Sequence, residues 1–482
     1  MANHFPPPAR SPVGLKRAIL CAIALAVGTV WLLQDGAAPP SHAIVDLPVE
    51  APPPKVEAPR HRISSIALTV RSAPNPNASI LGWIEPTEPF DVFAHVSGPD
   101  CDEPGWAKTE GGGFVCLSGS KSTEETSVRL PRLVRFVHPD PKEWDHYIST
   151  MSYDTDPEDR IDALVPFIYA KRWRKWRGPN YASVSAFENG ESPIRKLGAG
   201  RKYHFVDAVD TSKGTVLMRD GGVVVPSDEV HVYPLTKFQG WDLNTEPIPP
   251  GHLPAWAIDY DGTAVHTQPS QSAPVAKRLE YHTPIVVEDE PADRAGHWWI
   301  MPNGLGAGIP GYVNDQTGIR HWVPSSQTTG LSEGDIWIDV DLDQQVLALR
   351  RGEDIEFVTL VSTGEPGTGT PRGIYSIMDK SIWTDMASRP ASDDPYYVEK
   401  VPWVMHFKKR YALHGTFWHW GFGHTASHGC INLSVRDARY VFDRVAPTTY
   451  GGWHTALASR DTPGTTLRIR RGQGAVPDKR GR

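Results

Sequence analysis

The chain has 482 residues, and 49 lysine and arginine residues against 56 aspartate and glutamate residues give it a net charge of −7. At about 150 residues per domain this length predicts roughly three or four domains, and a hydrophobic content of 39% argues against a chain that is disordered throughout. Because a dedicated nucleic-acid-binding protein would carry a strong basic bias, the acidic balance predicts no nucleic-acid partner.

The first 36 residues have the layout of an export signal. Basic residues precede an uncharged apolar run, residues 18–33, and a proline-rich tract follows it. As a helix this run spans about 24 Å, less than the roughly 30 Å of a bilayer core. We therefore expect residues 1–36 to be a signal peptide or a membrane anchor, and residues 37–62 to be an extended linker. The order of charges predicts that the rest of the chain is exported, to the periplasm or the cell wall.

Export gives the cysteines different roles. Cys101 and Cys116 lie fifteen residues apart in one glycine-rich segment, and an oxidising compartment favours a disulfide between them. Cys21 belongs to the apolar run of the export signal. Cys430 is then left as a single thiol in an exported protein, so it is a candidate reactive group.

Three segments repeat a pattern of short strands at about ten-residue spacing, separated by glycine- and proline-rich turns. They cover residues 63–120, 180–236 and 254–324, and the faint middle copy includes a predicted strand at 184–187. Such spacing is typical of small β-barrels. The pattern resembles bacterial SH3-like domains, which accompany cell-wall enzymes, and this resemblance implies that the segments bind the wall. The alternative is that they are passive spacers.

A connector, residues 121–179, separates the first two copies. We expect it to be partly helical, with a helix over residues 157–170. It ends in the sequence Lys-Arg-Trp-Arg-Lys-Trp-Arg, residues 171–177, in which basic residues are interleaved with tryptophan. That composition suits contact with an anionic glycan or a membrane surface. The alternative is the solvated end of a helix whose aromatic side chains pack inward.

The pattern changes at Asp335, and we expect a different domain over residues 333–472, followed by a disordered tail, 473–482. Apolar and polar residues alternate from Ile336 to Leu342, which predicts a half-buried strand. Ser434 is a good N-cap for a helix that starts just after Cys430. The expected fold class is mostly β, with small β-barrels ahead of a sheet domain that has one helix directly after this cysteine. Its further strands are predicted at 346–349, 355–361, 374–377, 403–407, 411–413 and 467–470.

Two histidines lie close to the single thiol in the sequence. His414 precedes Cys430 by sixteen positions and His428 precedes it by two. A thiol with a pKa near 8.5 needs a base or a nearby cation to act as a nucleophile, and either histidine could supply it. Backbone N–H groups around Gly429 and Cys430 could stabilise an oxyanion. The helix that begins at Ser434 would favour the thiolate form of the cysteine.

The same stretch of the chain is compatible with two alternatives to nucleophilic catalysis. Five histidine and cysteine residues within seventeen positions could bind zinc, although the glycines between them argue against a helix that would align the ligands. Buried structural histidines beside an inert core cysteine are the second alternative. A serine hydrolase is not indicated, because the Gly-x-Ser-x-Gly motif is missing. We expect the protein to use no cofactor. We also expect no metal at the five residues His414, His419, His424, His428 and Cys430.

The sequence around these residues resembles the signature of the YkuD family of L,D-transpeptidases. It reads Leu-His-Gly-Thr at 413–416 and Ser-His-Gly-Cys at 427–430, and the similarity extends over roughly residues 334–471. Many members carry arginine two positions after the cysteine, where this chain has Asn432. The resemblance implies a β-sandwich for this domain and peptidoglycan stem peptides as its partners.

The resemblance also implies a reaction. Cys430 would attack the bond after the third residue of a stem peptide to form a thioester, and a neighbouring stem would resolve the thioester as a 3→3 cross-link. His414 would be the base, with its ring oriented by the Gly415 carbonyl. The loop 427–430 would shape the site, and the N–H groups of its last three residues would hold the oxyanion; the loop consists of Ser427, His428, Gly429 and Cys430.

The outcome of the reaction and the substrate contacts stay open. Water could resolve the same thioester, which would make the protein an L,D-carboxypeptidase or endopeptidase, and a non-catalytic wall-binding protein is a third alternative. The candidate contacts for stem carboxylates are Arg372, Arg410 and Asn432, and Trp418 and Trp420 are candidates for the walls of the groove. For each of these residues, ordinary surface or packing duty is the alternative.

Overall fold

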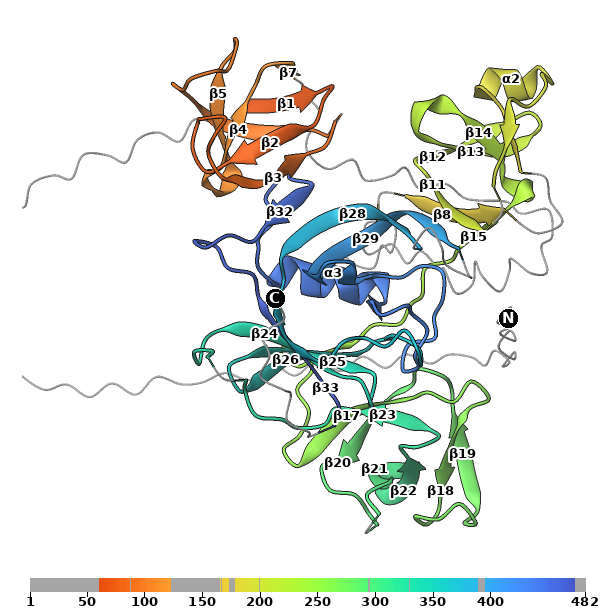
Figure 1. Ribbon diagram of the computed structural model, residues 1–482. Helices are drawn as coiled ribbons and strands as arrows, with labels where there is room; N and C mark the ends of the chain where they lie inside the picture. Colours follow the sequence, from red (N-terminus) through yellow and green to blue (C-terminus); the bar gives the residue numbers. More distant parts are fainter. Residues whose placement is uncertain are drawn as a thin grey trace, which may run out of the picture. The chain divides into compact units, whose positions relative to one another are not determined.

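The computed structural model describes most of the chain beyond residue 59 (Figure 1). The predicted export signal, most of the predicted linker and the predicted tail lie outside the described residues. Within the described part of the chain, no helix is long and apolar enough to cross a membrane. The described ranges are 60–86, 88–122, 165, 167–172, 178–198, 200–293, 295–328, 330–388 and 395–472.

The first β module, residues 60–122, is a sheet of short antiparallel strands in the order β3-β2-β6-β5-β4-β1-β7. The short strands that the repeat predicts are present, and alternate side chains such as Val70, Ile84 and Val115 enter one buried core. The strands are β1 (Arg60–Ser64), β2 (Leu68–Arg71), β3 (Ile80–Ile84), β4 (Phe90–Val96), β5 (Trp106–Thr109), β6 (Phe114–Cys116) and β7 (Ser120–Ser122).

The second β module, residues 168–232, contains the three-stranded sheets β15-β8-β11 and β12-β13-β14 and the strand pair β9-β10. Its core includes Tyr203, Phe205, Leu217 and Val225. The strands are β8 (Ile168–Arg172), β9 (Pro179–Asn180), β10 (Arg195–Lys196), β11 (Arg201–Phe205), β12 (Asp207–Thr211), β13 (Gly214–Met218), β14 (Val224–Pro226) and β15 (Val230–Val232).

Two predictions for this part of the chain are wrong. The helix expected over 157–170 does not extend over its last residues, because 168–170 belong to strand β8, which is hydrogen-bonded to β11 on one side and to β15 on the other. Residues 123–164 and 173–177 lie outside the described residues. The strand expected at 184–187 is helix α2 (Val184–Glu188), which begins because the Ser183 hydroxyl accepts a hydrogen bond from the Ala186 N–H at 3.1 Å.

The third β module, residues 252–321, has two antiparallel sheets, β20-β17-β23 and β19-β18-β22-β21. These strands fall where the third copy of the repeat predicts them. Whether the three modules are SH3-like remains a prediction. The strands are β17 (His252–Ala257), β18 (Thr263–His266), β19 (Val275–Leu279), β20 (Pro284–Glu288), β21 (Trp298–Gly306), β22 (Ile309–Asn314) and β23 (Ile319–His321).

The C-terminal domain, residues 334–472, is built around two groups of strands. One has the order β16-β26-β25-β24-β33-β27, and the other contains β32, β28, β29, β30 and β31. Side chains from both groups and from helix α3 (Val435–Arg444) share one buried core. The expected fold class, mostly β with a helix after Cys430, is confirmed. The strands are β16 (Trp241–Asp242), β24 (Ile336–Asp341), β25 (Val346–Arg351), β26 (Asp354–Leu360), β27 (Gly373–Ser376), β28 (Asp379–Ala387), β29 (Tyr397–Lys408), β30 (Tyr411–Gly415), β31 (Ile431–Leu433), β32 (Thr455–Leu457) and β33 (Thr466–Arg470).

Helix α3 begins and ends on side-chain hydrogen bonds. The Ser434 hydroxyl accepts from the Asp437 N–H at 3.0 Å, which is the predicted N-cap. Buried Asp437 in turn accepts from the Gly240 N–H at 2.9 Å and the Thr359 hydroxyl at 2.6 Å, and its burial raises the pKa of its carboxyl to about 6. At the other end, the Lys380 ammonium donates to the Val445 carbonyl at 2.7 Å.

All three modules contact the C-terminal domain, through paired strands or through a common buried core. Strand β3 of the first module pairs with β32, and β11 of the second module runs parallel to β29. The third module has a core that is continuous with β25 and β26, since Trp256 and Ile258 belong to one buried cluster with Ala348 and Leu360. In the described part of the chain, each module is therefore in contact with the C-terminal domain.

Candidate active site

Strands β30 and β31 bring the predicted catalytic residues together. They are parallel, with Leu413 opposite Ile431 and His414 opposite Asn432. Continued by one residue pair, this register sets Cys430 opposite Ala412, and the Ala412 N–H does act on the Cys430 thiol. Cys430 directly precedes β31, and its Sγ contacts backbone groups that lie just ahead of His414, namely the Arg410 carbonyl and the Ala412 N–H.

The His414 ring is held as a neutral imidazole with one nitrogen free for proton transfer. Its side chain is 2% exposed, and burial lowers its pKa to about 4, an effect only partly offset by the Gly415 carbonyl. Nδ1 lies 3.2 Å from that carbonyl oxygen. Since a carbonyl can only accept, Nδ1 carries the proton and Nε2 keeps its lone pair. This is the ring orientation that the sequence resemblance implied.

The Cys430 thiol is protonated at neutral pH. It is a free cysteine, and its Sγ donates to the Arg410 carbonyl oxygen at 3.7 Å. Burial raises the pKa of the thiol above its usual value, and the Ala412 N–H offsets this only in part. Desolvation therefore opposes the thiolate form of Cys430, and the expectation that helix α3 favours that form stays a prediction.

The loop 427–430 is locked by its own serine. The Ser427 hydroxyl accepts from the Gly429 N–H at 3.0 Å and donates to the Cys430 carbonyl at 2.6 Å. This takes up one of the N–H groups that the sequence assigned to the oxyanion. Gly429 has a φ of 114°, and a Cβ there would come within 2.4 Å of the Tyr411 ring, so only glycine fits at this position.

A second loop, residues 364–370, supports the first. The Thr370 hydroxyl donates to the Gly429 carbonyl at 3.0 Å, and the Thr368 hydroxyl donates to the Ser427 carbonyl at 3.2 Å. The Glu365 N–H also donates to the Ser427 carbonyl, at 2.9 Å. These contacts account for the glycine- and threonine-rich sequence of the loop, which places its backbone against the cysteine loop.

Asn432 is buried and one of its polar side-chain atoms has no hydrogen-bond partner within the described ranges. Its side-chain amide lies 2.9 Å from His419 Nε2, and the other amide atom is buried without a hydrogen-bond partner among the described residues. The Gly421 N–H donates to His419 Nδ1, and burial lowers the pKa of that ring to about 3, so Nε2 carries the proton. With the amide turned so that its oxygen accepts from His419, the amide N–H groups would be the buried groups without a hydrogen-bond partner in the described part of the chain.

Residues 335–468 match the family model of YkuD, the L,D-transpeptidase catalytic domain. They form a YkuD domain. The chain is also similar to solved structures of an Enterococcus faecium L,D-transpeptidase mutant (20% identity, TM-score 0.23, 28% of this chain and 49% of that chain), a Mycobacterium smegmatis L,D-transpeptidase (16%, 0.24, 39% and 89%) and Mycobacterium tuberculosis L,D-transpeptidase 3 (18%, 0.23, 34% and 75%). The match spans about half the length of the Enterococcus chain. No curated protein matches the chain.

The third module holds the loop 416–426 of the YkuD domain through its backbone. The Tyr281 hydroxyl and His282 Nε2 donate to the Phe422 carbonyl at 2.8 and 3.1 Å. Arg320 Nε donates to the Gly423 carbonyl at 3.2 Å, and His424 Nε2 donates to the Ile258 carbonyl at 2.8 Å. Sequence reasoning missed these residues, because no local pattern indicates which loop they meet.

The remaining predicted contacts of the YkuD domain lie on its surface. Arg372, Arg410 and His428 are exposed, and the His428 ring lies 5.4 Å from that of Tyr396. Trp418 is half-buried, with its ring 5.7 Å from the His414 ring, as a groove wall would require. Within the described residues, His, Cys, Asp and Glu side chains form no group of three that could hold a metal ion.

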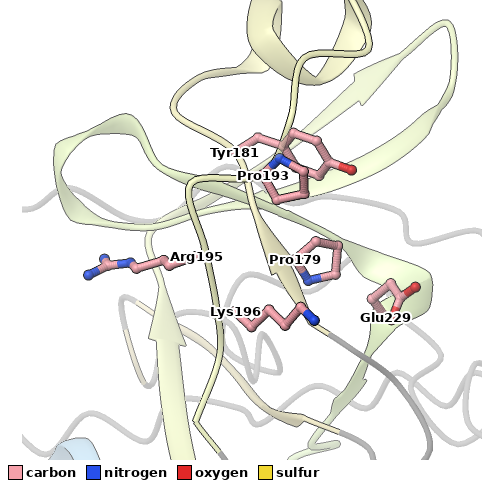
Figure 2. Close-up of a pocket in the computed structure, with 6 residues that line it drawn as sticks. All are labelled: Pro179, Tyr181, Pro193, Arg195, Lys196 and Glu229. Carbon is pink, nitrogen blue, oxygen red and sulfur yellow. The ribbon is translucent and has the colours of Figure 1, made fainter.

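Outside the YkuD domain, the second module contains a pocket of about 440 Å³ (Figure 2). Its charged lining side chains, Arg195, Lys196 and Glu229, belong to none of the predicted site residues. The predicted basic stretch 171–177 is described only at Lys171 and Arg172, in strand β8.

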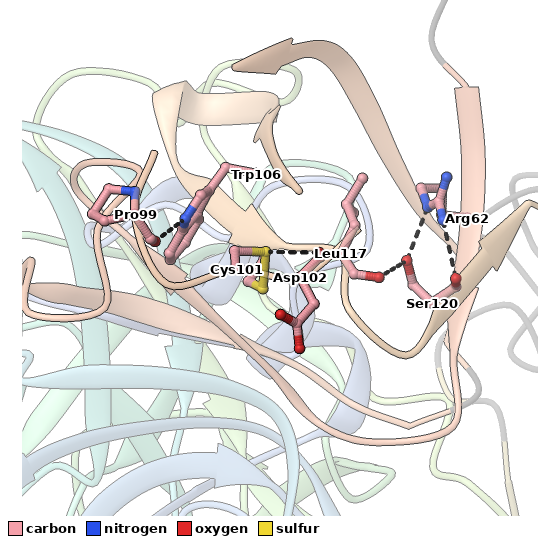
Figure 3. Close-up of a disulfide and its surroundings, with 8 residues drawn as sticks. Arg62, Pro99, Cys101, Asp102, Trp106, Leu117 and Ser120 are labelled. Carbon is pink, nitrogen blue, oxygen red and sulfur yellow. Dashed lines mark hydrogen bonds between the residues drawn. A yellow bond between two sulfur atoms is a disulfide. The ribbon is translucent and has the colours of Figure 1, made fainter. Parts of the chain in front are cut away.

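The two remaining cysteines are joined in the first module. Cys101 and Cys116 form a disulfide, with their Cα atoms 5.7 Å apart (Figure 3). Beside it, the Trp106 indole N–H donates to the Pro99 carbonyl at 2.8 Å. This bond fastens the loop that carries Cys101 to strand β5.

Proposed function

We propose that the protein is an exported cysteine acyltransferase that acts on peptidoglycan stem peptides and makes 3→3 cross-links through a thioester on Cys430. The observation that carries the proposal is the parallel pairing of β30 and β31 within the YkuD match, which supports a Cys430 thiol beside the strand that carries the neutral His414 imidazole. The proposed location, the periplasm or the cell wall, rests on the sequence of residues 1–36. Wall or membrane contact by the modules and by residues 171–177 is part of the same proposal.

In the proposed first step, the Cys430 Sγ forms a bond to the carbonyl carbon of the third stem residue. The thiol proton passes to His414 Nε2, the nitrogen that the Gly415 contact leaves unprotonated. As the tetrahedral intermediate collapses, the C–N bond breaks and the same proton goes to the departing amine of the terminal D-alanine. In the second step a side-chain amine of another stem attacks the thioester, His414 takes its proton and returns it to the Cys430 sulfur.

The Cys430 thiol and the His414 imidazole are both neutral before substrate binds, so no ion pair activates the thiol in advance. The pKa of His414 is lowered and that of Cys430 is raised, so a resting thiolate–imidazolium pair is disfavoured. Proton transfer then accompanies attack on the carbonyl, and charge stabilisation at the oxyanion matters most. The His428 and Cys430 N–H groups and the Asn432 amide are the proposed donors, because Ser427 engages the Gly429 N–H.

Mass spectrometry of the full chain with a tetrapeptide stem tests this proposal. We expect a covalent adduct on wild type, none on Cys430→Ala, and a dimeric stem product joined 3→3. The Cys101–Cys116 disulfide serves as an internal control, because its cysteines should gain no mass. Release of D-alanine without any dimer would mean that water resolves the same thioester, and the assigned reaction would then be hydrolysis and not cross-linking. A wild-type protein that binds the stem and forms no adduct would overturn the enzyme assignment.

A further inference from the structure

The second module has one sheet whose two faces differ in chemistry. Along β8, β11 and β15, alternate residues enter the module's own core, and these are Ala170, Tyr203, Phe205 and Val230. The residues between them belong to the opposite face. The register sets Lys171 of β8 between Lys202 of β11 and His231 of β15. The opposite face carries Tyr169, Lys171, Lys202, His204 and His231.

This polar face is docked on the YkuD domain. The Tyr169 ring stacks on Phe417 with centroids 3.7 Å apart, and its hydroxyl donates to the Lys400 carbonyl at 2.6 Å. His204 Nδ1 lies 2.8 Å from a Glu399 carboxylate oxygen, next to the backbone pairing of Lys202 with Val398. Strand register and buried contacts therefore fix where the module's lysines point.

Lys202 reaches the wall of the active site. Its ammonium lies 5.6 Å from the centre of the Trp418 ring, and that ring lies 5.7 Å from the ring of His414. The positive charge of Lys202 acts on His419 inside the site. It lowers the pKa of that ring, as a smaller cause than burial and His414. Lys171 adds a second ammonium on the same face, 5.3 Å from the Tyr233 ring.

We propose that Lys202, with Lys171 beside it, binds a carboxylate of the donor stem peptide, so that the second module completes the substrate site of the YkuD domain. This inference rests on the proposed function. An extended peptide spans about 3.3 Å per residue, so a carboxylate two or three residues from the cleaved bond lies about 7–10 Å from the reacting carbonyl. A cation separated from His414 by one indole ring suits that carboxylate, and it stands too far from the cleaved bond to take part in the chemistry.

Acylation kinetics with two matched stems test the role of Lys202. One stem carries its free carboxylates, and in the other the carboxylate nearest the cleaved bond on its N-terminal side is an amide. For the wild-type full chain we expect the KM for acylation to be about tenfold lower with the free carboxylate. In Lys202→Gln this ratio should fall close to one with kcat little changed, and Lys202→Arg should restore most of it. Lys213→Gln, at an exposed turn of the same module, is the matched control.

The outcomes separate this inference from the proposed function. A displaced second module would take Lys202 with it and would also lower the ratio, so it is the restored ratio in Lys202→Arg, which keeps the charge, that assigns the effect to the side chain of Lys202. A ratio in Lys202→Gln equal to that of wild type would overturn the role of Lys202, and so would a wild type that does not distinguish the two stems. Absence of any adduct on wild type would overturn the proposed function itself.

Discussion

The second and third β modules both contact the loop that leads to Cys430, and they contact different groups of it. The third module donates to backbone carbonyls of Phe422 and Gly423 and shares a core with the YkuD domain. The second module contacts side chains of the loop instead, since Tyr169 stacks on Phe417 and Lys202 lies over the Trp418 ring. Hydrogen bonds to backbone carbonyls restrict the conformation of a loop, whereas an ammonium group beside a half-buried side chain can also interact with a ligand.

The comparison teaches that similar sequence repeats can take on different duties. We infer that the third module sets the conformation of the active-site loop, and that the second module supplies positive charge to one wall. Damage to the third module should then lower kcat, and damage to the second should raise KM. Three changes test this division, in order of decreasing expected effect.

The largest effect is expected from Phe422→Ala. Phe422 is fully buried between the third module and the YkuD domain, so its truncation should lower the free energy of unfolding by about 3–5 kcal/mol and lower kcat through the displaced loop. Phe205→Ala, in the core of the second module, is the matched control with a similar cost in stability. Chemical denaturation and acylation kinetics give both quantities. An equal loss of kcat in both variants would contradict the division of duties.

A smaller effect is expected from Glu399→Gln. Glu399 is 6% exposed and accepts from Arg219 Nη2 at 2.7 Å and from the His204 N–H at 3.2 Å, so its neutralisation removes charge-assisted bonds. We expect a loss of about 2–3 kcal/mol in the free energy of unfolding and a higher KM for acylation, with kcat nearly unchanged. Asp210→Asn, on the exposed hairpin of the same module, should change neither. A lower kcat with an unchanged KM would place the second module in loop positioning instead.

The smallest effect is the pH dependence of the His204 and His282 contacts, one of which should weaken as pH rises and the other as pH falls. Burial lowers the pKa of His204, but its bonds to Asp220 and Glu399 outweigh burial and raise it, so this contact is strong below about pH 6.5 and weakens as pH rises through the raised pKa. Burial lowers the pKa of His282 to about 4, so the third-module contact is strong above about pH 6.5 and weakens as pH falls toward 4.

Hydrogen-exchange protection factors measure this response at single amides. The N–H of Val398, beside the second module, should lose protection above neutral pH. The N–H of Gly423, which donates to the Val361 carbonyl at 2.9 Å, should lose it in acid. In His204→Gln the alkaline loss at Val398 should disappear while the acid loss at Gly423 persists. Loss of protection at both amides in the same direction would contradict the assignment.

Much of the fold was predictable, because the relevant signals are local. The strand that begins at Ile336 and the N-cap at Ser434 depend on neighbouring residues, and both are present in the structure. The expectation that this strand is half-buried is wrong, because Asp339 and Asp341 are buried too, in ion pairs with arginines of β33. Local signals failed where tertiary contacts compete with them. Residues 184–187 have strand-like composition but form a helix, since Ser183 caps them, and residues 168–170 form a strand because β11 and β15 lie on either side.

The sequence by itself determined the mostly β fold, the YkuD domain and the chemical candidates Cys430 and His414, since a motif keeps its residue types and spacing wherever it is packed. Only the tertiary structure decided that the thiol and imidazole are neutral, that Ser427 engages the Gly429 N–H, and that Lys202 stands beside Trp418. The physical reason is that alternation along a strand tells which side chains share a face, but not which surface that face will meet. The desolvation of a side chain and the charges around it depend on the surface against which that face packs.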